Sequence, residues 1–330
     1  METVPNYRRK RCNLASSKAC RNTSNIILLS YFIFVMSGVV EAIEAGQVFR
    51  SHELTFRKCY ASLLTRSIVT AYRCLETAGV AYTPLEYDWR WNERHYGALQ
   101  GLSKERTGVR LGQEKVMKWR RSYDACPPLM TSEHPHHETI NNDPRYRHLD
   151  PPSGESLEIC QIRVVEAWKD FCKDIATAED DDSESDYSLL VAHANTLRAL
   201  VMHLDDIGVN EIEGLNIPTA IPFYYDIDKT TGLVVSSHVD SNDVIAAGKF
   251  RGVYISDERK KRSFLERRRA ANDPWMWALH DHQVKASMLE GNAVDEPNGE
   301  ATTNEDDLEA LEEEARKNTE LFAPGSGWHA

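Results

Sequence analysis

The sequence has no surplus of positive charge and no paired cysteine motif. Its 330 residues include 51 acidic and 39 basic side chains, which give a formal net charge of −12. This acidic balance argues against general binding to nucleic acid or to an anionic membrane, because both attract basic surfaces. The seven cysteines are odd in number and lack the spacing of a zinc site, so we expect the reduced thiols of a cytoplasmic protein.

A long membrane-spanning run is also lacking. The apolar residues 26–40 follow a basic stretch of residues 1–25 and are fewer than the roughly 20 that a membrane span needs. Residues 26–35 have the continuous apolar character of a buried parallel strand. Two alternatives stay open for this region: a targeting or signal-anchor segment, and a disordered or misassigned N-terminus.

The hydrophobic residues that are present indicate an α/β protein. They make up 41% of the chain, enough for a substantial core, and a single domain with extensions is the simplest interpretation. The patterns predict further strands over residues 55–61 and 187–192, and helices over residues 37–48, 62–78, 103–123, 155–174 and 195–205.

Residues 92–101 have the composition of a functional cleft. They bring Glu93, Arg94, His95 and Tyr96 together between small and polar residues. A carboxylate beside a guanidinium and an imidazole can transfer a proton, while the guanidinium binds an anion. Taken alone, the segment also fits a polar surface loop.

Three further places favour anion chemistry. His193 follows an apolar strand and precedes a helix, and ligands of open α/β sheets bind beyond the carboxyl ends of strands. Arg66 falls in the first turn of a helix, where free N–H groups and the helix dipole attract phosphate. Arg120 and Arg121 follow Trp119, and a guanidinium fork fits carboxylate or phosphate oxygens.

A histidine cluster offers a possible metal site. It consists of His134, His136 and His137 beside Glu133 and Glu138. Proline and polar neighbours favour a mobile loop instead, because metal ligands need a rigid surrounding shell. We therefore expect no metal.

Seven segments of the chain together resemble a known family. The ordered set resembles the phosphoglycerate mutases that depend on 2,3-bisphosphoglycerate, members of the histidine phosphatase superfamily. The matching segments are residues 64–67, 92–101, 118–121, 142–146, 154–157, 192–200 and 215–219. The resemblance implies a three-layer αβα sandwich with a mostly parallel central sheet. It also implies a mutase-like domain over residues 37–245, between a divergent segment 1–36 and a partly helical extension 246–330 with an acidic tail.

The resemblance implies an isomerase that moves a phosphoryl group between the 3- and 2-oxygens of glycerate. It implies 2,3-bisphosphoglycerate as the phosphoryl primer, no metal, phosphoglycerates as small anionic substrates, and a cytoplasmic protein of a family in which homo-oligomers are common. Glu93 is then the acid/base, and His193 stabilises the transferring group. The implied substrate-binding residues are Arg66, Arg94, His95, Tyr96, Lys104, Arg120, Arg121, Ala194 and Asn195.

One family motif is missing. The family's first strand ends in Arg-His-Gly-Glu, whose histidine becomes phosphorylated, and no Arg-His-Gly occurs in this sequence. His52 lies beyond the first matching helix and is not its equivalent. Ala194 and Ala220 also stand where the family usually has glycine. Three hypotheses follow: a mutase with a lost or replaced N-terminal sequence, a non-catalytic anion-binding protein, and a membrane-anchored interaction protein.

Overall fold

A six-stranded sheet forms the centre of the protein. The computed structural model describes residues 23–30, 35–102, 104–177, 187–235 and 250–255. The strands lie in the order β3-β2-β4-β1-β5-β6, and β1 to β4 are mutually parallel, whereas β5 is antiparallel to both of its neighbours. Their bounds are Thr23–Ser30 for β1, Lys58–Ala61 for β2, Leu85–Tyr87 for β3, Tyr187–Ala192 for β4, Phe223–Asp228 for β5 and Val253–Tyr254 for β6.

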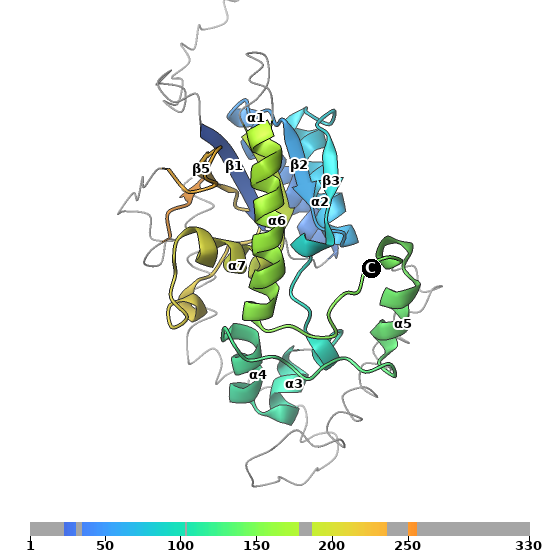
Figure 1. Ribbon diagram of the computed structural model, residues 1–330. Coiled ribbons are helices and arrows are strands. Elements are labelled where there is room, and N and C mark those ends of the chain that lie inside the picture. Colours follow the sequence, from blue (N-terminus) through green and yellow to red (C-terminus); the bar gives the residue numbers. More distant parts are fainter. Residues whose placement is uncertain (1–22, 31–34, 103, 178–186, 236–249, 256–330) are drawn as a thin grey trace, which may run out of the picture.

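Helices cover both faces of this sheet (Figure 1). The long helices are α1 (Val35–Ser51), α2 (Thr65–Ala78), α6 (Leu157–Thr177) and α7 (Ala194–Leu204). Side chains of a strand alternate between its faces, so Ile27 and Leu29 pack in the core with α1 and α2, whereas Ile26 and Leu28 pack with α6 and α7. The predicted three-layer αβα sandwich with a mostly parallel sheet is confirmed.

The apolar run after residue 25 forms the strand β1, in the middle of the sheet. Ile26, Ile27, Leu28 and Leu29 are at most 1% exposed, because β4 and β5 flank the strand and helices cover both faces. The strand prediction is confirmed over residues 26–30, Val35 begins α1, and residues 31–34 lie outside the described residues. Within the described ranges, no helix has both the length and the apolar character needed to cross a membrane.

Beyond the strand ends lie three short helices (Figure 1). The predicted helix 103–123 is in fact two helices, α3 (Lys104–Leu111) and α4 (Gln113–Arg121), because Gly112 between them has a φ of 90°. The histidine cluster begins α5 (Pro135–Asn142), where His134 is the N-cap. Short 3-10 helices span Trp89–Trp91, Gly97–Leu99, Pro144–Tyr146 and Ile212–Gly214.

The end of the sheet and the two alanines at family glycine positions are also described by the structure. Strand β6 pairs with β5 beyond residue 245, where the family resemblance fades. Ala220 has a φ of 56°, in the left-handed region that favours glycine, whereas Ala194 begins α7 without such strain. Residues 1–22, which hold most of the basic stretch, and residues 256–330, which hold the acidic tail, lie outside the described residues.

Candidate functional site

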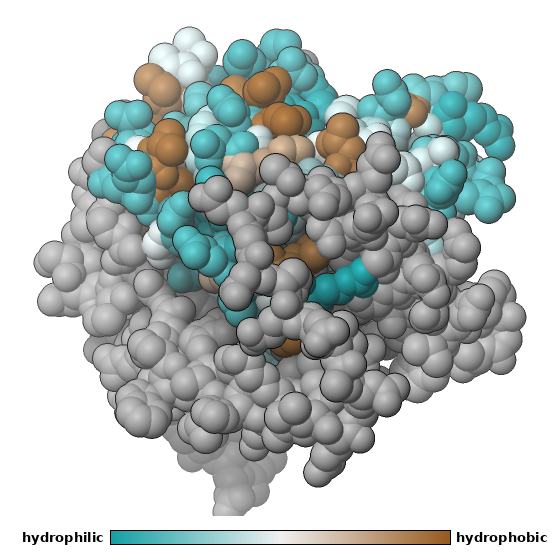
Figure 2. Space-filling model, turned by 90° about the horizontal axis from the view of Figure 1, so that it is seen from below, coloured by the Kyte–Doolittle hydropathy of each residue, from teal (hydrophilic) through white to brown (hydrophobic). Residues whose placement is uncertain are grey.

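A cavity of about 670 Å³ lies at the carboxyl ends of β2 and β4, where the helices α2 and α7 begin. On the described surface seen from below, hydrophilic residues predominate and several hydrophobic ones lie among them (Figure 2). The described lining of the cavity holds more cations than anions. The arginines are Arg66, Arg94, Arg120, Arg121, Arg145, Arg163 and Arg198, and the carboxylates are Glu93, Asp143 and Glu155.

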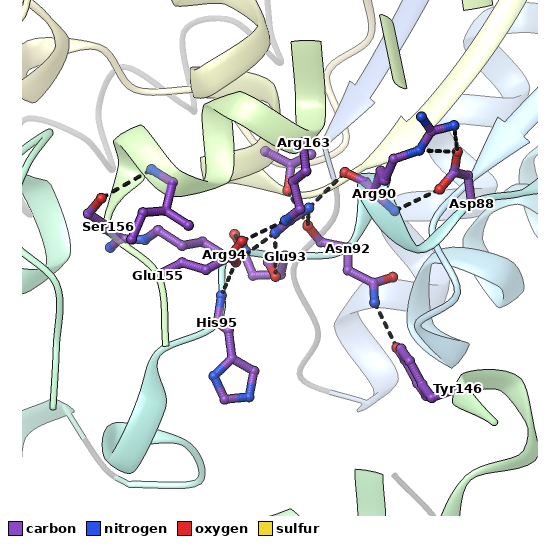
Figure 3. A network of polar contacts seen from close by, with 12 residues as sticks. Asp88, Arg90, Asn92, Glu93, Arg94, His95, Tyr146, Glu155, Ser156 and Arg163 are labelled. Carbon is purple, nitrogen blue, oxygen red and sulfur yellow. Dashed lines mark hydrogen bonds and ion pairs between the residues drawn. The ribbon is translucent and has the colours of Figure 1, made fainter. Parts of the chain in front are cut away.

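Residues 92–101 form one wall of the cavity and are held by a buried ion pair between Arg163, on α6, and Glu155, two residues before that helix begins. Arg163 Nε and Nη2 donate to the Glu155 carboxylate at 2.6 and 2.8 Å. Arg163 Nη1 also donates to the carbonyl oxygens of Arg90 and Asn92, and the backbone N–H of His95 donates to Glu155 (Figure 3). Charged partners inside a protein fix geometry, so this pair holds the wall in place.

Arginine side chains surround the ring of Tyr96. The guanidinium carbons of Arg94 and Arg120 each lie 4.8 Å from its ring centroid, within cation–π range. Arg94 is 1% exposed, and its Nη2 donates to the carbonyl oxygens of Trp119 and Arg120 at 3.0 Å. Arg120, one of the two predicted anion-binding arginines on α4, therefore contacts the 92–101 segment directly.

Helix α7 supplies a second wall. Asn195 and Arg198 are three residues apart, so they share one face of the helix and both line the cavity. Arg198 donates to Asn195 Oδ1 at 2.9 Å, to the carbonyl of Ile212 at 2.7 Å and to that of Arg121 at 3.3 Å. Burial, and then the charges of Arg121 and Arg94, lower the pKa of Arg198 to about 10.

His193 lies at the carboxyl end of β4, as predicted, but it is fully buried. Arg66 Nε, always a donor, donates to His193 Nδ1 at 3.3 Å, so Nε2 carries the proton and donates to Ser62 Oγ at 2.7 Å. This tautomer cannot take a proton from Ser62, so the two do not form a serine–histidine catalytic pair. Arg66, rather than the imidazole, lines the cavity here.

Glu93 and His95 also line the cavity. The Glu93 carboxylate accepts a hydrogen bond from the backbone N–H of Arg94 at 2.9 Å. His95 Nδ1 accepts from the backbone N–H of Gly97 at 3.1 Å, and burial lowers the pKa of His95. Lys104 begins α3, and its side chain lies outside the described part of the structure.

A sequence profile described as "Histidine phosphatase superfamily (branch 1)" matches residues 36–139 and 129–237. The chain belongs to the histidine phosphatase superfamily. Two similar relatives are 2,3-bisphosphoglycerate-dependent phosphoglycerate mutases of Nitratidesulfovibrio vulgaris, strains Hildenborough and DP4. Each is 43% identical over 196 residues, which cover 58% of this chain and 75% of the relative.

Two similar solved structures share lower identity with the chain. A mycobacterial glucosyl-3-phosphoglycerate phosphatase is 18% identical, covering 62% of this chain and 90% of that chain, with a TM-score of 0.47. A phosphoglycerate mutase from Bacillus anthracis is 17% identical, covering 65% and 92%, with a TM-score of 0.43.

The end of β1 differs from what the histidine phosphatase resemblance implies. Ser30, the last residue of β1, pairs with Ala192, the residue before His193. The resemblance places a phosphorylated histidine at this edge of the sheet. The sequence between Ser30 and Val35 is Tyr-Phe-Ile-Phe, which has no histidine.

Several residues that line the cavity were not predicted as site residues. They are Arg198, the Glu155–Arg163 pair, the Asp143–Arg145 pair and Asn92. All of them except Arg163 lie in segments that resemble the family, namely residues 92–101, 142–146, 154–157 and 192–200. The histidine cluster lies near the cavity through His136, but within the described ranges no three His, Cys, Asp or Glu side chains form a metal-binding group.

Proposed function

We propose that the protein binds 3-phosphoglycerate and 2-phosphoglycerate in this cavity and that their interconversion, an isomerase reaction, is its function. The observation that carries the proposal is a pair of buried arginines, Arg94 and Arg198, which have no carboxylate partner among the described residues. Uncompensated buried guanidiniums are costly unless an anion joins them. The names of the 43% identical relatives support a phosphoglycerate as that anion.

The proposed roles follow from the contacts. Glu93 exchanges a proton with the substrate hydroxyl, because it is the cavity carboxylate without a cationic side chain bonded to it in the described part of the structure. The substrate's oxyanions bind Arg66, Arg94, Arg120 and Arg121, assisted by His95, Tyr96, Lys104, Ala194 and Asn195. His193 acts through Arg66 by orienting its guanidinium.

The proposed reaction starts from 2,3-bisphosphoglycerate, which supplies the phosphoryl group without a metal. In the family resemblance a histidine at the end of β1 accepts that group and transfers it to the free hydroxyl oxygen of the monophosphate, which forms a bisphosphate. The histidine then takes back the other phosphoryl group, and the isomeric monophosphate is released. We place the protein in the cytoplasm, where its described cysteines, all free, remain reduced.

A second candidate function is phosphoglycerate binding without turnover. The sequence after β1 favours it, because neither Ser30 nor the Tyr-Phe-Ile-Phe segment supplies the histidine that would carry the phosphoryl group. A protein of this kind would hold the metabolite and leave it unchanged.

A turnover assay paired with covalent labelling decides between the two. Conversion of 3- to 2-phosphoglycerate is followed by a coupled dehydration step, with bisphosphoglycerate added, for the wild type and for Glu93→Gln. Turnover that falls in Glu93→Gln, with acid-labile radiolabel on the wild type, supports the mutase. Binding of 3-phosphoglycerate without turnover or label supports the second candidate, and no binding at all overturns both.

A further inference from the structure

The hydrogen bonds from α7 to Tyr96 run in one direction. Arg198 Nη1 donates to Asn195 Oδ1 at 2.9 Å, and Asn195 Nδ2 donates to the Tyr96 hydroxyl at 2.8 Å. Arginine has no acceptor atom, so the Asn195 amide must present its oxygen to Arg198. Its NH2 group therefore faces Tyr96, and the Tyr96 oxygen accepts.

Arg198 is held firmly enough to impose this order. It is 3% exposed, and Nη2 donates to the carbonyl oxygens of Ile212 and Arg121, so the guanidinium is fixed on both of its ends. Asn195 is 9% exposed, so water does not readily compete for its amide. A flipped amide would set two donors against each other.

The Tyr96 hydroxyl proton is left to bond elsewhere. No described residue accepts it, and the side chains that flank its ring, Arg94 and Arg120, offer donors only. Tyr96 lines the cavity, where the lining arginines attract an oxyanion. An oxyanion suits these donors, because it can accept hydrogen bonds from the Tyr96 hydroxyl and from the guanidiniums together.

We infer that Arg198 is a positioning residue which, through Asn195, turns the Tyr96 hydroxyl proton toward an oxyanion bound in the cavity. The inference deepens the proposed function and rests on its claim that the cavity binds phosphorylated anions. The same bound anion would offset the charges of Arg94 and Arg121, which together with burial lower the pKa of Arg198. The role differs from a direct ion pair because its effect passes through one hydroxyl group.

A double-mutant cycle with inorganic phosphate tests the inference. Phosphate affinity is measured by calorimetry for the wild type, Tyr96→Phe, Arg198→Met and the double variant. Direct loss of the Arg198 charge is the same in both backgrounds, so it cancels in the cycle. We expect Arg198→Met to weaken phosphate binding less in the Tyr96→Phe background, by at least about threefold.

Asn195→Asp provides a second arm with the same side-chain shape. Its carboxylate still accepts from Arg198 but also accepts from Tyr96, which turns the hydroxyl proton away from the cavity. We expect a larger loss of phosphate affinity when Tyr96 is present than in the Tyr96→Phe background. This arm decides alone if thermal melting shows that Arg198→Met does not fold.

The inference is overturned if, in both experiments, the fold-losses of phosphate affinity in the single variants multiply to give that of the double variant. It is also overturned if the wild type binds no phosphate. The outcome is separable from that of the proposed function. Coupling with phosphate but no affinity for phosphoglycerates preserves the positioning role and rejects the function. Phosphoglycerate binding without coupling does the reverse.

Discussion

Arg163 and Arg198 line the same cavity and are 6% and 3% exposed, yet they have opposite surroundings. Arg163 forms a two-pronged ion pair with Glu155, and although burial opposes its charge, this carboxylate helps to hold the pKa of Arg163 above its usual value. Arg198 meets carbonyl and amide oxygens and other arginines, and its pKa falls. We propose that the contrast separates an arginine that supports the cavity wall from one that positions the Tyr96 hydroxyl for a bound anion.

The largest expected effect comes from removing Arg163. Arg163→Met leaves the Glu155 carboxylate buried and unpaired, so we expect the free energy of unfolding to fall by about 3–5 kcal/mol. Urea denaturation measures this change. The double variant Arg163→Met with Glu155→Leu is the control, and it should recover much of the loss. A single variant as stable as the wild type would remove the contrast.

Arg198→Met should cost less stability than Arg163→Met. It leaves carbonyl and amide oxygens without a donor, on the order of 1–3 kcal/mol, but no carboxylate, and it relieves repulsion with Arg94 and Arg121. The same denaturation experiment, repeated with saturating phosphate, should show less ligand-induced stabilisation than the wild type shows. An Arg198→Met protein that gains full stabilisation from phosphate would contradict the assignment.

His193 extends the comparison, because it avoids the cost of buried charge by staying neutral. Burial, and then the charges of Arg66 and Arg163, lower its pKa well below the usual value. Below about pH 6.5 His193 binds a proton in the unfolded chain but stays neutral in the folded protein. The free energy of unfolding therefore falls with decreasing pH, by up to about 1.4 kcal/mol per pH unit. His193→Gln should flatten this slope between pH 6.5 and the lower folded pKa, whereas an unchanged slope would place the titration elsewhere.

The smallest expected effect is that of salt, which should change phosphate affinity more than it changes the stability contributed by Arg163. A buried ion pair is screened little, so stability from Glu155–Arg163 should change little between roughly 0.05 M and roughly 0.5 M salt. Phosphate affinity at the cavity should weaken several-fold over that range, because salt screens the attraction between the cavity arginines and the anion. Calorimetry and denaturation at both concentrations provide the check. Salt-independent phosphate binding would count against a clustered cationic site.

Sequence patterns predicted the layers of the fold better than their ends. The continuous apolar residues of β1 and β4 predict buried strands, because a strand covered on both faces of the sheet shields every side chain of such a run from water. The break at Gly112 was missed because a glycine inside a charged helix pattern does not reveal its positive φ. Strands β3 and β6 are too short, at three and two residues, to give a periodic signal.

The site was predictable where the chemistry lies within one segment, and less so where it depends on pairing. Residues 92–101 and Arg120 meet as expected, since Arg94 bonds to α4. The burial of His193 behind Arg66 and the partners of Arg163 arise from contacts between distant segments. No local pattern distinguishes an arginine with a carboxylate partner from one without.

A calorimetric titration with 3-phosphoglycerate, set against unphosphorylated glycerate, tests the central claim most directly. The account predicts saturable binding of 3-phosphoglycerate, much weaker binding of glycerate, and a clear loss of affinity in Arg198→Met. It is contradicted if the wild type releases no heat of binding with 3-phosphoglycerate, or if Arg198→Met binds as tightly as the wild type.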